Sequence, residues 1–398
     1  MRLTDPFLPL ELVEHIAGFL WGGFPTLKTW ASTCRSWHAI TLPTIYRSVI
    51  IDNELSLRSL ERALVARPHI APWIRELRIT VDPHGSTTTT SWEGGPRNLP
   101  WIYDLPKKLP RHLTRLHEIH FSKIIKRRWA YDEWMFFPSF RRFGTVKSLV
   151  FTHCVFPEDV VDSLVHSLSQ LKDLQFRDLA FAGTSFVGAE IAPPKYKQPQ
   201  LNSFTLHSEQ IFMPYPASSV VLKWTLPMQT AWNLRSLHLF VGYPSDVPEV
   251  GRIIRAFSSS LQDLSIKFAQ SELWGKAKDR GHGHGSSVVF EFLDLSPNIE
   301  IRILDLHNPL FSSVTWLLSR IRSPHLHTIQ FTSIFNSSRS IKVNDFEPLD
   351  EVLHQPNLAS INEVRFNHKG SLASSIVQQK LKKCLPATYG RGIRIKVY

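Results

Sequence analysis

The sequence predicts an α/β fold in which a small three-helix module, residues 5–51, precedes a long array of parallel strands alternating with helices, residues 55–398. Two observations predict the array. An apolar triplet recurs along the chain, and the residues between its members are almost all polar. Three short helical patterns near the N-terminus predict the module. Arrays of this kind bury their apolar positions by stacking each repeat on the next.

The apolar triplet occupies positions i, i+3 and i+5 and recurs about ten times, at intervals of roughly 25–42 residues. The copies are Ile74/Leu77/Ile79, Leu116/Ile119/Phe121, Val146/Leu149/Phe151, Leu171/Leu174/Phe176, Leu201/Phe204/Leu206, Leu234/Leu237/Leu239, Leu261/Leu264/Ile266, Ile301/Leu304/Leu306, Leu326/Ile329/Phe331 and Ile361/Val364/Phe366. The spacing matches LxxLxL, the strand segment of leucine-rich repeats, whose usual length is about 20–29 residues. We therefore expect an irregular leucine-rich-repeat solenoid. The third copy continues through Cys154, which is expected to be buried rather than reactive.

Polar residues fill positions i+2 and i+4, as a strand with one buried and one wet face requires. We expect the wet face to contact a protein substrate. The candidate substrate-facing residues, all at i+4, are Arg78, His120, Gln175, His238, Asp305, Gln330 and Arg365.

Helical patterns fill the gaps between triplets, at 57–64, 160–168, 250–257, 314–321 and 346–353. A final helix around 375–385 and a basic strand at 392–398 are expected to cap the array. Insertions rich in Gly, Pro, Ser and Thr tend to follow the strands, at 81–99, 182–200, 207–227, 269–287 and 332–341. They are predicted to be loops along a binding edge, although tolerated loop growth explains any single one equally well.

The N-terminal module contains three helical patterns. The first places Leu12, Val13, Ile16, Phe19 and Leu20 on one face, with Pro9 in its first turn. The second is expected to start after Pro25-Thr26, with Thr26 as its cap. It is expected to bury, at helical spacing, Leu27, Trp30, Ala31, Cys34 and Trp37. The third is expected to open at Leu42-Pro43 and to run through Tyr46 to Ile50. So small a unit cannot bury this many large side chains alone, so part of the surface should meet a partner, unless the helices only cap the array.

These residues also carry a resemblance to a known family. Leu8-Pro9-Leu10-Glu11-Leu12, Cys34-Arg35-Ser36-Trp37 and Leu42-Pro43 with Tyr46-Arg47 resemble the F-box, most closely that of fungal F-box-like proteins. The resemblance covers about an eighth of the chain and departs from the family at Trp21-Gly22-Gly23-Phe24. It implies that the helices bind the Skp-type adaptor of a cullin–RING ubiquitin ligase. The adaptor-binding residues that it implies are Leu8, Pro9, Leu12, Ile16, Leu20, Cys34, Arg35 and Trp37.

Composition places the chain among folded proteins of a reducing compartment. Hydrophobic residues make up 43% of its 398 residues and charged residues 20%, which is normal for a globular protein. No apolar run reaches the roughly 18–20 residues that span a bilayer, and Glu11, Glu14 and His15 interrupt the N-terminal apolar stretch. Three widely separated cysteines favour neither a disulfide framework nor a zinc site. We therefore expect a cytosolic or nuclear protein with no membrane partner.

No nucleophile, phosphate-loop, dinucleotide or zinc-protease motif is present, so we expect neither enzymatic activity nor a cofactor. The glycine- and histidine-containing stretch 281–285 is interpreted as a loop rather than a metal site. The leading hypothesis is a substrate-receptor subunit of a cullin–RING ligase, with a Skp-type adaptor and a protein substrate as partners. The alternative is a basic repeat scaffold, net charge +12, that binds nucleic acid or another protein without a ligase. Nucleic acid is disfavoured because the basic residues are dispersed.

Overall fold

In a computed structural model of the chain, the described residues are 9–19, 24–81, 100–125, 137–181, 199–207, 232–242, 246–269, 293–309, 311–333, 341 and 343–398. They form two compact units, Met1–Leu171 with Phe181–Pro199, and Lys172–Ala180 with Gln200–Tyr398. Leu8, Leu20, the 281–285 stretch and most of the predicted insertions lie outside the described residues. Among the helices described, none combines the length and the apolar character needed to cross a bilayer.

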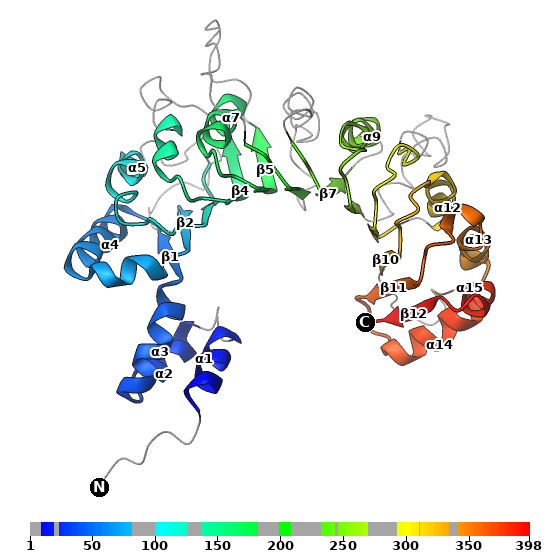
Figure 1. The fold of residues 1–398 in the computed structure, drawn as a ribbon, viewed down its shortest axis with the longest axis horizontal. Coiled ribbons are helices and arrows are strands. Elements are labelled where there is room, and N and C mark those ends of the chain that lie inside the picture. Colours follow the sequence, from blue (N-terminus) through cyan, green and yellow to red (C-terminus); the bar gives the residue numbers. More distant parts are fainter. Residues whose placement is uncertain are drawn as a thin grey trace, which may run out of the picture. The chain divides into compact units, whose positions relative to one another are not determined.

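The first unit begins with three helices, α1 (Leu10–Phe19), α2 (Phe24–Ala31) and α3 (Arg35–Tyr46). Both α1 and α2 pack on α3 (Figure 1). Val13 and Ala17 of α1 and Leu27 of α2 are buried in this packing. The predicted number of helices is therefore confirmed, with an apolar core of small and branched side chains.

The boundaries of the second and third helices differ from the prediction. Thr26, expected to cap α2, lies inside it, and α2 ends at Ala31. Cys34 adopts an extended backbone as the N-cap residue of α3 and is exposed, so the prediction that it is buried in the second helix is wrong. Pro43 lies inside α3 rather than at a helix start. It stands near the C-terminal end of α3, where its missing N–H removes only one hydrogen bond.

Val49 and Ile50 belong to a strand rather than to the third helix. They lie in β1 (Ser48–Ile51), which pairs in parallel with β2 (Glu76–Thr80). The β-branched run from Val49 to Ile51 suits an extended backbone, and Ile51 is buried while Ile50 is 56% exposed. The helical module therefore leads directly into the sheet, one strand earlier than the triplets predict.

The first unit continues with β3 (Glu118–Ser122) and β4 (Ser148–Phe156), each parallel to the strand before it. The connections contain α4 (Glu54–Ala66), η1 (Pro68–Trp73), η2 (Pro100–Asp104), α5 (Leu105–Lys108) and η3 (Phe137–Arg142), and α7 (Glu158–Ser167) follows β4. A capping box fixes the start of α4. The Asn53 side chain accepts the Ser56 N–H at 2.9 Å, and the Ser56 hydroxyl accepts the Asn53 N–H at 3.2 Å.

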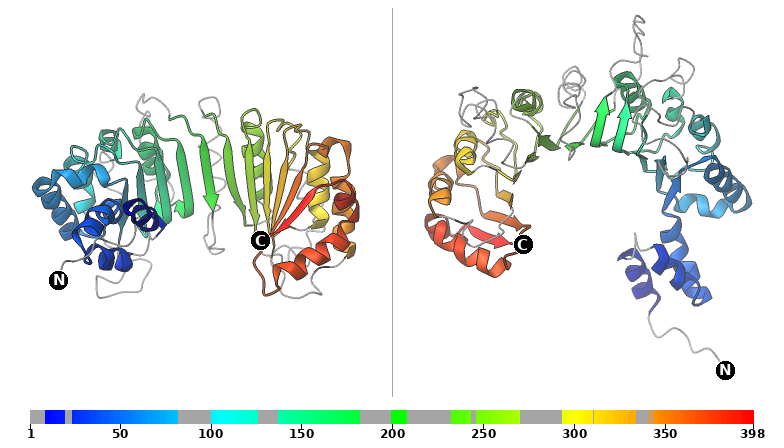
Figure 2. Two further views of the ribbon diagram at one scale, coloured as in Figure 1. Left: turned by 60° about the horizontal axis from the view of Figure 1, so that its bottom comes forward. Right: turned by 180° about the vertical axis from the view of Figure 1, so that it is seen from behind.

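The second unit repeats the same plan over eight strands, again parallel and in chain order. They are β5 (Asp173–Phe181), β6 (Ser203–His207), β7 (Ser236–Val241), β8 (Asp263–Phe268), β9 (Ile303–His307), β10 (Thr328–Ser333), β11 (Glu363–His368) and β12 (Arg394–Val397). The helical segments are α9 (Val247–Ala256), α12 (Phe311–Arg320), α13 (Val343–Leu353), η7 (Pro356–Leu358), α14 (Ser374–Cys384) and α15 (Pro386–Gly390). Figure 2 shows these strands side by side. The predicted helix before a terminal basic strand is confirmed by α14 and β12.

The apolar triplets form the core, as predicted. Each of the ten strands from β2 to β11 begins at the i+2 residue of a triplet, and every triplet member is buried. Aromatic members stack between neighbouring strands. The ring centroids of Phe121 and Phe151 lie 5.5 Å apart in the first unit, and those of Phe331 and Phe366 lie 5.3 Å apart in the second. The strands therefore stabilise one another through the apolar positions that also define the sequence repeat.

Cys154 is a core residue, which confirms its predicted role. Its Sγ donates to the carbonyl oxygens of Phe121 and Thr152, each at 3.4 Å. Burial raises the pKa of this thiol to about 12. The side chain is consequently a protonated packing group at neutral pH.

Hydroxyl groups join successive repeats in a way that the sequence analysis missed. Thr145, Ser260 and Ser360 each stand directly before a triplet. Their hydroxyls donate to the carbonyl of the first residue in the preceding triplet, Leu116, Leu234 and Leu326, at 2.7, 2.9 and 2.8 Å. A Ser or Thr at this position therefore hydrogen-bonds one repeat of the array to the repeat before it.

In four repeats the chain turns at a residue with a left-handed backbone, directly after β3 and β9 and inside β4 and β5. Lys123, His153, Asp178 and Asn308 have φ values of 56°, 52°, 52° and 51°. Each lies seven positions after the first residue of its triplet. Backbone hydrogen bonds hold this turn, since the Lys123 N–H donates to the Thr152 carbonyl at 2.9 Å. For side chains other than glycine this conformation costs about 1–2 kcal/mol, so the array imposes it on the sequence.

Replacing Lys123 with valine should destabilise the first unit, because a β-branched side chain fits a positive φ poorly. We expect Lys123→Val to lower the free energy of unfolding by about 1–2 kcal/mol, while Lys123→Gly leaves it unchanged or higher. Exposed Lys147, which lacks a positive φ, provides the control variant Lys147→Val. Urea unfolding followed by circular dichroism measures the difference in the free energy of unfolding. Equal losses of this free energy in the two valine variants would contradict the proposed backbone strain at Lys123.

Candidate functional site

The first candidate surface is an apolar stripe on α1 formed by Leu12, Ile16 and Phe19, called here the α1 stripe. These residues recur at helical spacing and share one side of the helix. Leu12 is 48% exposed and Phe19 is 77% exposed, while Ile16 is half-buried. Val13 and Ala17, on the neighbouring side, are fully buried. Thus α1 buries one apolar side within the module and leaves a second one outside.

The other predicted adaptor-binding residues in the described part of the chain also keep accessible surface. Pro9, Cys34 and Arg35 are exposed, and Trp37 is half-buried. The rings of Trp30 and Trp37 lie 5.0 Å apart at 41°, which joins α2 to α3. The Trp37 Nε1 atom is buried, and no described residue accepts a hydrogen bond from it. Together these residues extend the accessible surface of the module from α1 to the α2–α3 junction.

The module meets the rest of its unit at the end of α3. The Tyr46 ring lies 6.3 Å from the Trp73 ring of η1, and the Arg47 carbonyl accepts the N–H groups of Arg75 and Glu76 at 2.9 and 3.0 Å. These contacts agree with the alternative interpretation, in which the helices only cap the array. It does not account for the exposed Leu12 and Phe19 of the α1 stripe.

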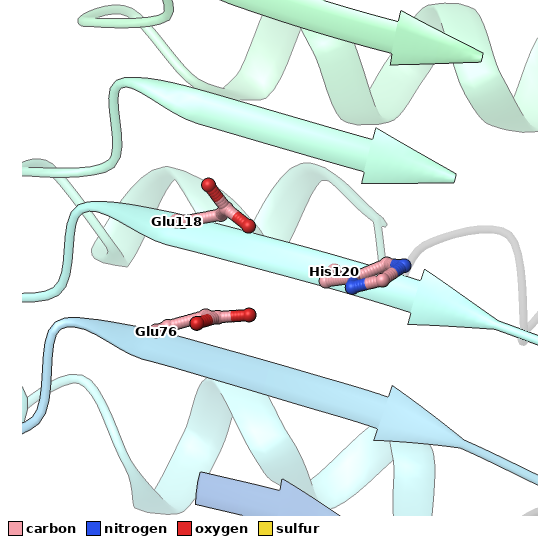
Figure 3. Close-up of side chains that lie close together, drawn as sticks. All are labelled: Glu76, Glu118 and His120. Atoms are coloured by element: carbon pink, nitrogen blue, oxygen red, sulfur yellow. The ribbon is translucent and has the colours of Figure 1, made fainter. Parts of the chain in front are cut away.

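The second candidate surface is the polar face of the strands. In the first unit, Glu76 and Arg78 of β2 lie beside Glu118 and His120 of β3, and Figure 3 places Glu76, Glu118 and His120 on one face. The Arg78 Nε atom donates to a Glu76 carboxylate oxygen. The His120 Nε2 atom lies 2.9 Å from the Thr152 hydroxyl of β4. Predicted residues Arg78 and His120 are therefore half-buried and hydrogen-bonded within the sheet.

Glu76, Glu118 and His120 also form the one group of possible metal ligands among the described residues, with ligand atoms within 4.8 Å of one another. The ion pair with Arg78 already supplies positive charge to Glu76. The contact with Thr152 occupies His120 Nε2. These contacts explain the cluster as a network within the sheet, and we assign no metal to it.

In the second unit, most of the predicted substrate-facing residues pair with a neighbour two positions away on the same strand. Gln175 Oε1 accepts from Arg177 Nη2 at 2.7 Å, His238 Nε2 lies 3.0 Å from the Ser236 hydroxyl, Asp305 Oδ2 lies 2.8 Å from His307 Nε2, and Arg365 Nη2 donates to Glu363 Oε2 at 3.1 Å. Gln330 is half-buried. His238 is exposed, whereas Gln175, Asp305 and Arg365 are half-buried. The face is polar, as expected, and many of its polar side chains contact another polar side chain on the same strand.

The sequence analysis missed a third column on the same face, at position i+6. On β5 to β9 this column is Arg177, His207, Phe240, Lys267 and His307, called here the basic row. The triplet ends at i+5, so a pattern based on the triplet stops one residue too early. The signal was present, because the period of two continues through i+6 in these strands.

Two cations hold the side chain of Glu363 at the C-terminal end of the second unit. Arg365 Nη2 donates to Oε2 at 3.1 Å, and Lys396 Nζ of β12 lies 2.7 Å from Oε1. The Glu363 side chain is 6% exposed. The hydrogen bonds from Arg365 and Lys396 lower the pKa of Glu363 to about 2. This ion pair links β11 to β12 and engages Arg365, one of the predicted substrate-facing residues.

Comparison with known proteins adds little to this description. No family model and no curated protein matches the sequence. A similar solved structure is the leucine-rich-repeat protein LegL7 from Legionella pneumophila, with 12% identity and a TM-score of 0.37 over 81% of this chain and 89% of that chain. A similarity this weak says nothing about function. The leucine-rich-repeat assignment rests on the chain's own parallel strands, which bury the LxxLxL positions repeat after repeat.

Neutralising Glu363 should change how the stability of the second unit depends on pH. Because its folded-state pKa lies below the ordinary value of 4.5, the ionised carboxylate stabilises the fold above about pH 4.5, and this contribution is lost as the pH falls toward 2. We expect Glu363→Gln to lower the free energy of unfolding by about 2 kcal/mol at pH 7, and the gap from the wild type to close near the folded-state pKa.

Urea unfolding at neutral and acidic pH measures this gap. Glu351→Gln, which removes an exposed carboxylate from α13 in the same unit, is the control and should cost little at either pH. A Glu363→Gln gap of constant size across the pH range would show that the carboxylate is not stabilised in its charged form.

Proposed function

We propose that this chain is a substrate-receptor subunit of a cullin–RING ubiquitin ligase. Its N-terminal helices bind a Skp-type adaptor, and its repeats bind a protein substrate. The chain performs no chemistry itself. It contributes by raising the effective concentration of the substrate at the transferring enzyme, which is the role of a two-sided binding protein.

The observation that carries the proposal is the exposed α1 stripe within a segment that resembles the F-box. Leu12 and Phe19 present large apolar surface on a helix whose other side is already packed. Such surface favours burial against another protein at about 25 cal/mol per Å². Leu12 and Ile16 are also among the positions that the F-box resemblance assigns to the adaptor. Local sequence and accessible surface therefore favour the same residues.

The repeats support the second half of the proposal more generally. A leucine-rich-repeat fold presents one strand face as an extended surface, and proteins of this architecture use such surfaces to bind partners. Here the described residues of that face carry charged, amide, imidazole and hydroxyl groups. This chemistry suits recognition of a polypeptide.

Truncating the two exposed side chains of the α1 stripe should weaken adaptor binding without unfolding the chain. We expect the double variant Leu12→Ala/Phe19→Ala to bind a purified Skp-type adaptor at least about 30-fold more weakly, because truncating a buried interface anchor costs about 2 kcal/mol or more. Since both side chains are exposed in the free chain, the thermal midpoint should not change. Biolayer interferometry with the immobilised full chain measures the affinity.

A matched control is available on α4 of the same unit, where Leu55 is 72% exposed and Val65 is 62% exposed. Leu55→Ala/Val65→Ala removes a comparable amount of apolar surface outside the module and should keep wild-type affinity. Retention of the adaptor by the α1 variant at wild-type strength, or failure of the wild type to bind at all, would end the ligase proposal.

A further inference from the structure

The basic row of the second unit forms a continuous surface from β5 to β9. Arg177 is in register with His207, and Lys267 lies between Phe240 and His307 in the strand pairing. Side-chain contacts also connect the row across β6, β7 and β8. Lys267 Nζ lies 3.4 Å from His207 Nε2 and 5.8 Å from the centre of the Phe240 ring, and the His207 and Phe240 rings lie 5.8 Å apart. Five neighbouring strands thus carry basic or aromatic groups at one level.

This surface is polarised along the strand direction. Acidic residues stand at the start of the same face, with Asp173 on β5 and Asp263 on β8. Arg177 and Lys267 stand four residues later on the same strands, roughly 13 Å away at about 3.3 Å per residue. None of the five positions of the basic row is acidic. The basic row therefore lies at or near the C-terminal ends of β6 to β9 and at the middle of β5.

We propose that the basic row binds an acidic, extended segment of a partner protein that crosses the strands. As a statement of substrate class this rests on the proposed function. Five strands at about 4.8 Å spacing span roughly 19 Å, which an extended segment of about six residues covers. Arg177 and Lys267 pair with its carboxylates, while His207 and Phe240 provide flat surfaces between the two charges. Exposed Arg177 is the residue most accessible to a carboxylate of the partner. In the contacts described, its guanidinium is bound only to the neutral Gln175 amide.

A protein segment fits this face better than a nucleic acid. A phosphate backbone lying on the strands would approach the carboxylates of Asp263 and Asp305, and the Asp305 carboxylate already occupies His307 Nε2 at 2.8 Å. An acidic peptide is narrower and places its carboxylates only along the row. The partner that the charges favour is therefore an acidic polypeptide.

The test compares short fluorescein-labelled probes on the full-length chain. One probe is an alternating Glu-Ser peptide of about eight residues, long enough to cross the five strands. The second is the same peptide with Gln in place of Glu, and the third is a thymidine oligonucleotide of similar length. The variant Arg177→Gln/Lys267→Gln removes two charges from the row. Arg252→Gln/Arg320→Gln removes two exposed charges from α9 and α12 of the same unit and serves as control.

Fluorescence anisotropy should show binding of the Glu-Ser peptide to the wild type and the control, and about tenfold weaker binding to the row variant, as expected for the loss of two partly exposed charge pairs. The Gln-Ser peptide should not bind. The proposal is overturned if the row variant and the control bind the acidic peptide equally. It is also overturned if the oligonucleotide binds more tightly than the peptide and loses that affinity in the row variant.

Adaptor binding separates this inference from the proposed function. The row variant should bind the Skp-type adaptor as the wild type does, because its substitutions lie far along the sequence from the α1 stripe. If the wild type does not bind the adaptor but does bind the acidic peptide, the proposed ligase role is wrong and the proposed peptide-binding surface stands. Loss of acidic-peptide binding with normal adaptor capture would remove only the surface.

Discussion

The structure depends on one constraint: no repeat can bury its own apolar triplet. A strand of five or six residues exposes both edges and one full face, so Leu77 and Ile79, or Leu304 and Leu306, are covered only when parallel strands stand beside them and helices lie on that face. The triplet is therefore both the local signal for a strand and the surface that joins repeats. Hydroxyl groups such as those of Thr145 and Ser260 add a directional element, because each reaches the carbonyl of the preceding triplet.

This constraint explains how far the sequence could predict the fold. Each of the ten strands β2 to β11 was predictable from its triplet and begins at the i+2 position, because a triplet with polar residues between its members fits only a half-buried strand. The helices between them were predictable from their period. The errors fall where local signals compete. Pro43 is a good first residue for a helix but also tolerable near a helix end, and the strand β1 needs the edge of β2, some 25 residues later in the chain, to exist at all. Cys34 looked like a core residue by spacing, yet it is the exposed N-cap residue of α3, with an extended backbone.

For the candidate sites, the sequence predicted only which face of the strand each residue occupies. Period-two alternation identifies Arg78, Asp305 and Arg365 as residues of the wet face, and the structure bears this out. It cannot reveal that each is tied to a neighbour two positions along its strand, to Glu76, His307 and Glu363. Such pairs form because alternate residues on a strand lie about 6.6 Å apart on the same side, within reach of an arginine or imidazole. A charged residue on this face is thus partly committed to stabilising its own strand. The basic row escaped prediction for a simpler reason, since the triplet that guided the search ends one position before it.

The two proposed surfaces also differ in the physics of recognition. The α1 stripe is apolar, so its affinity would come from buried area and depend little on ionic strength. The basic row is charged and partly exposed, so its affinity would fall as salt screens interactions beyond a Debye length of about 8 Å. If the proposed function holds, adaptor binding would be almost independent of ionic strength, whereas substrate binding would weaken as the salt concentration rises. This difference follows from the architecture: α1 keeps an exposed apolar side, whereas the sheet buries its apolar triplets between repeats and leaves mainly polar groups on its other face.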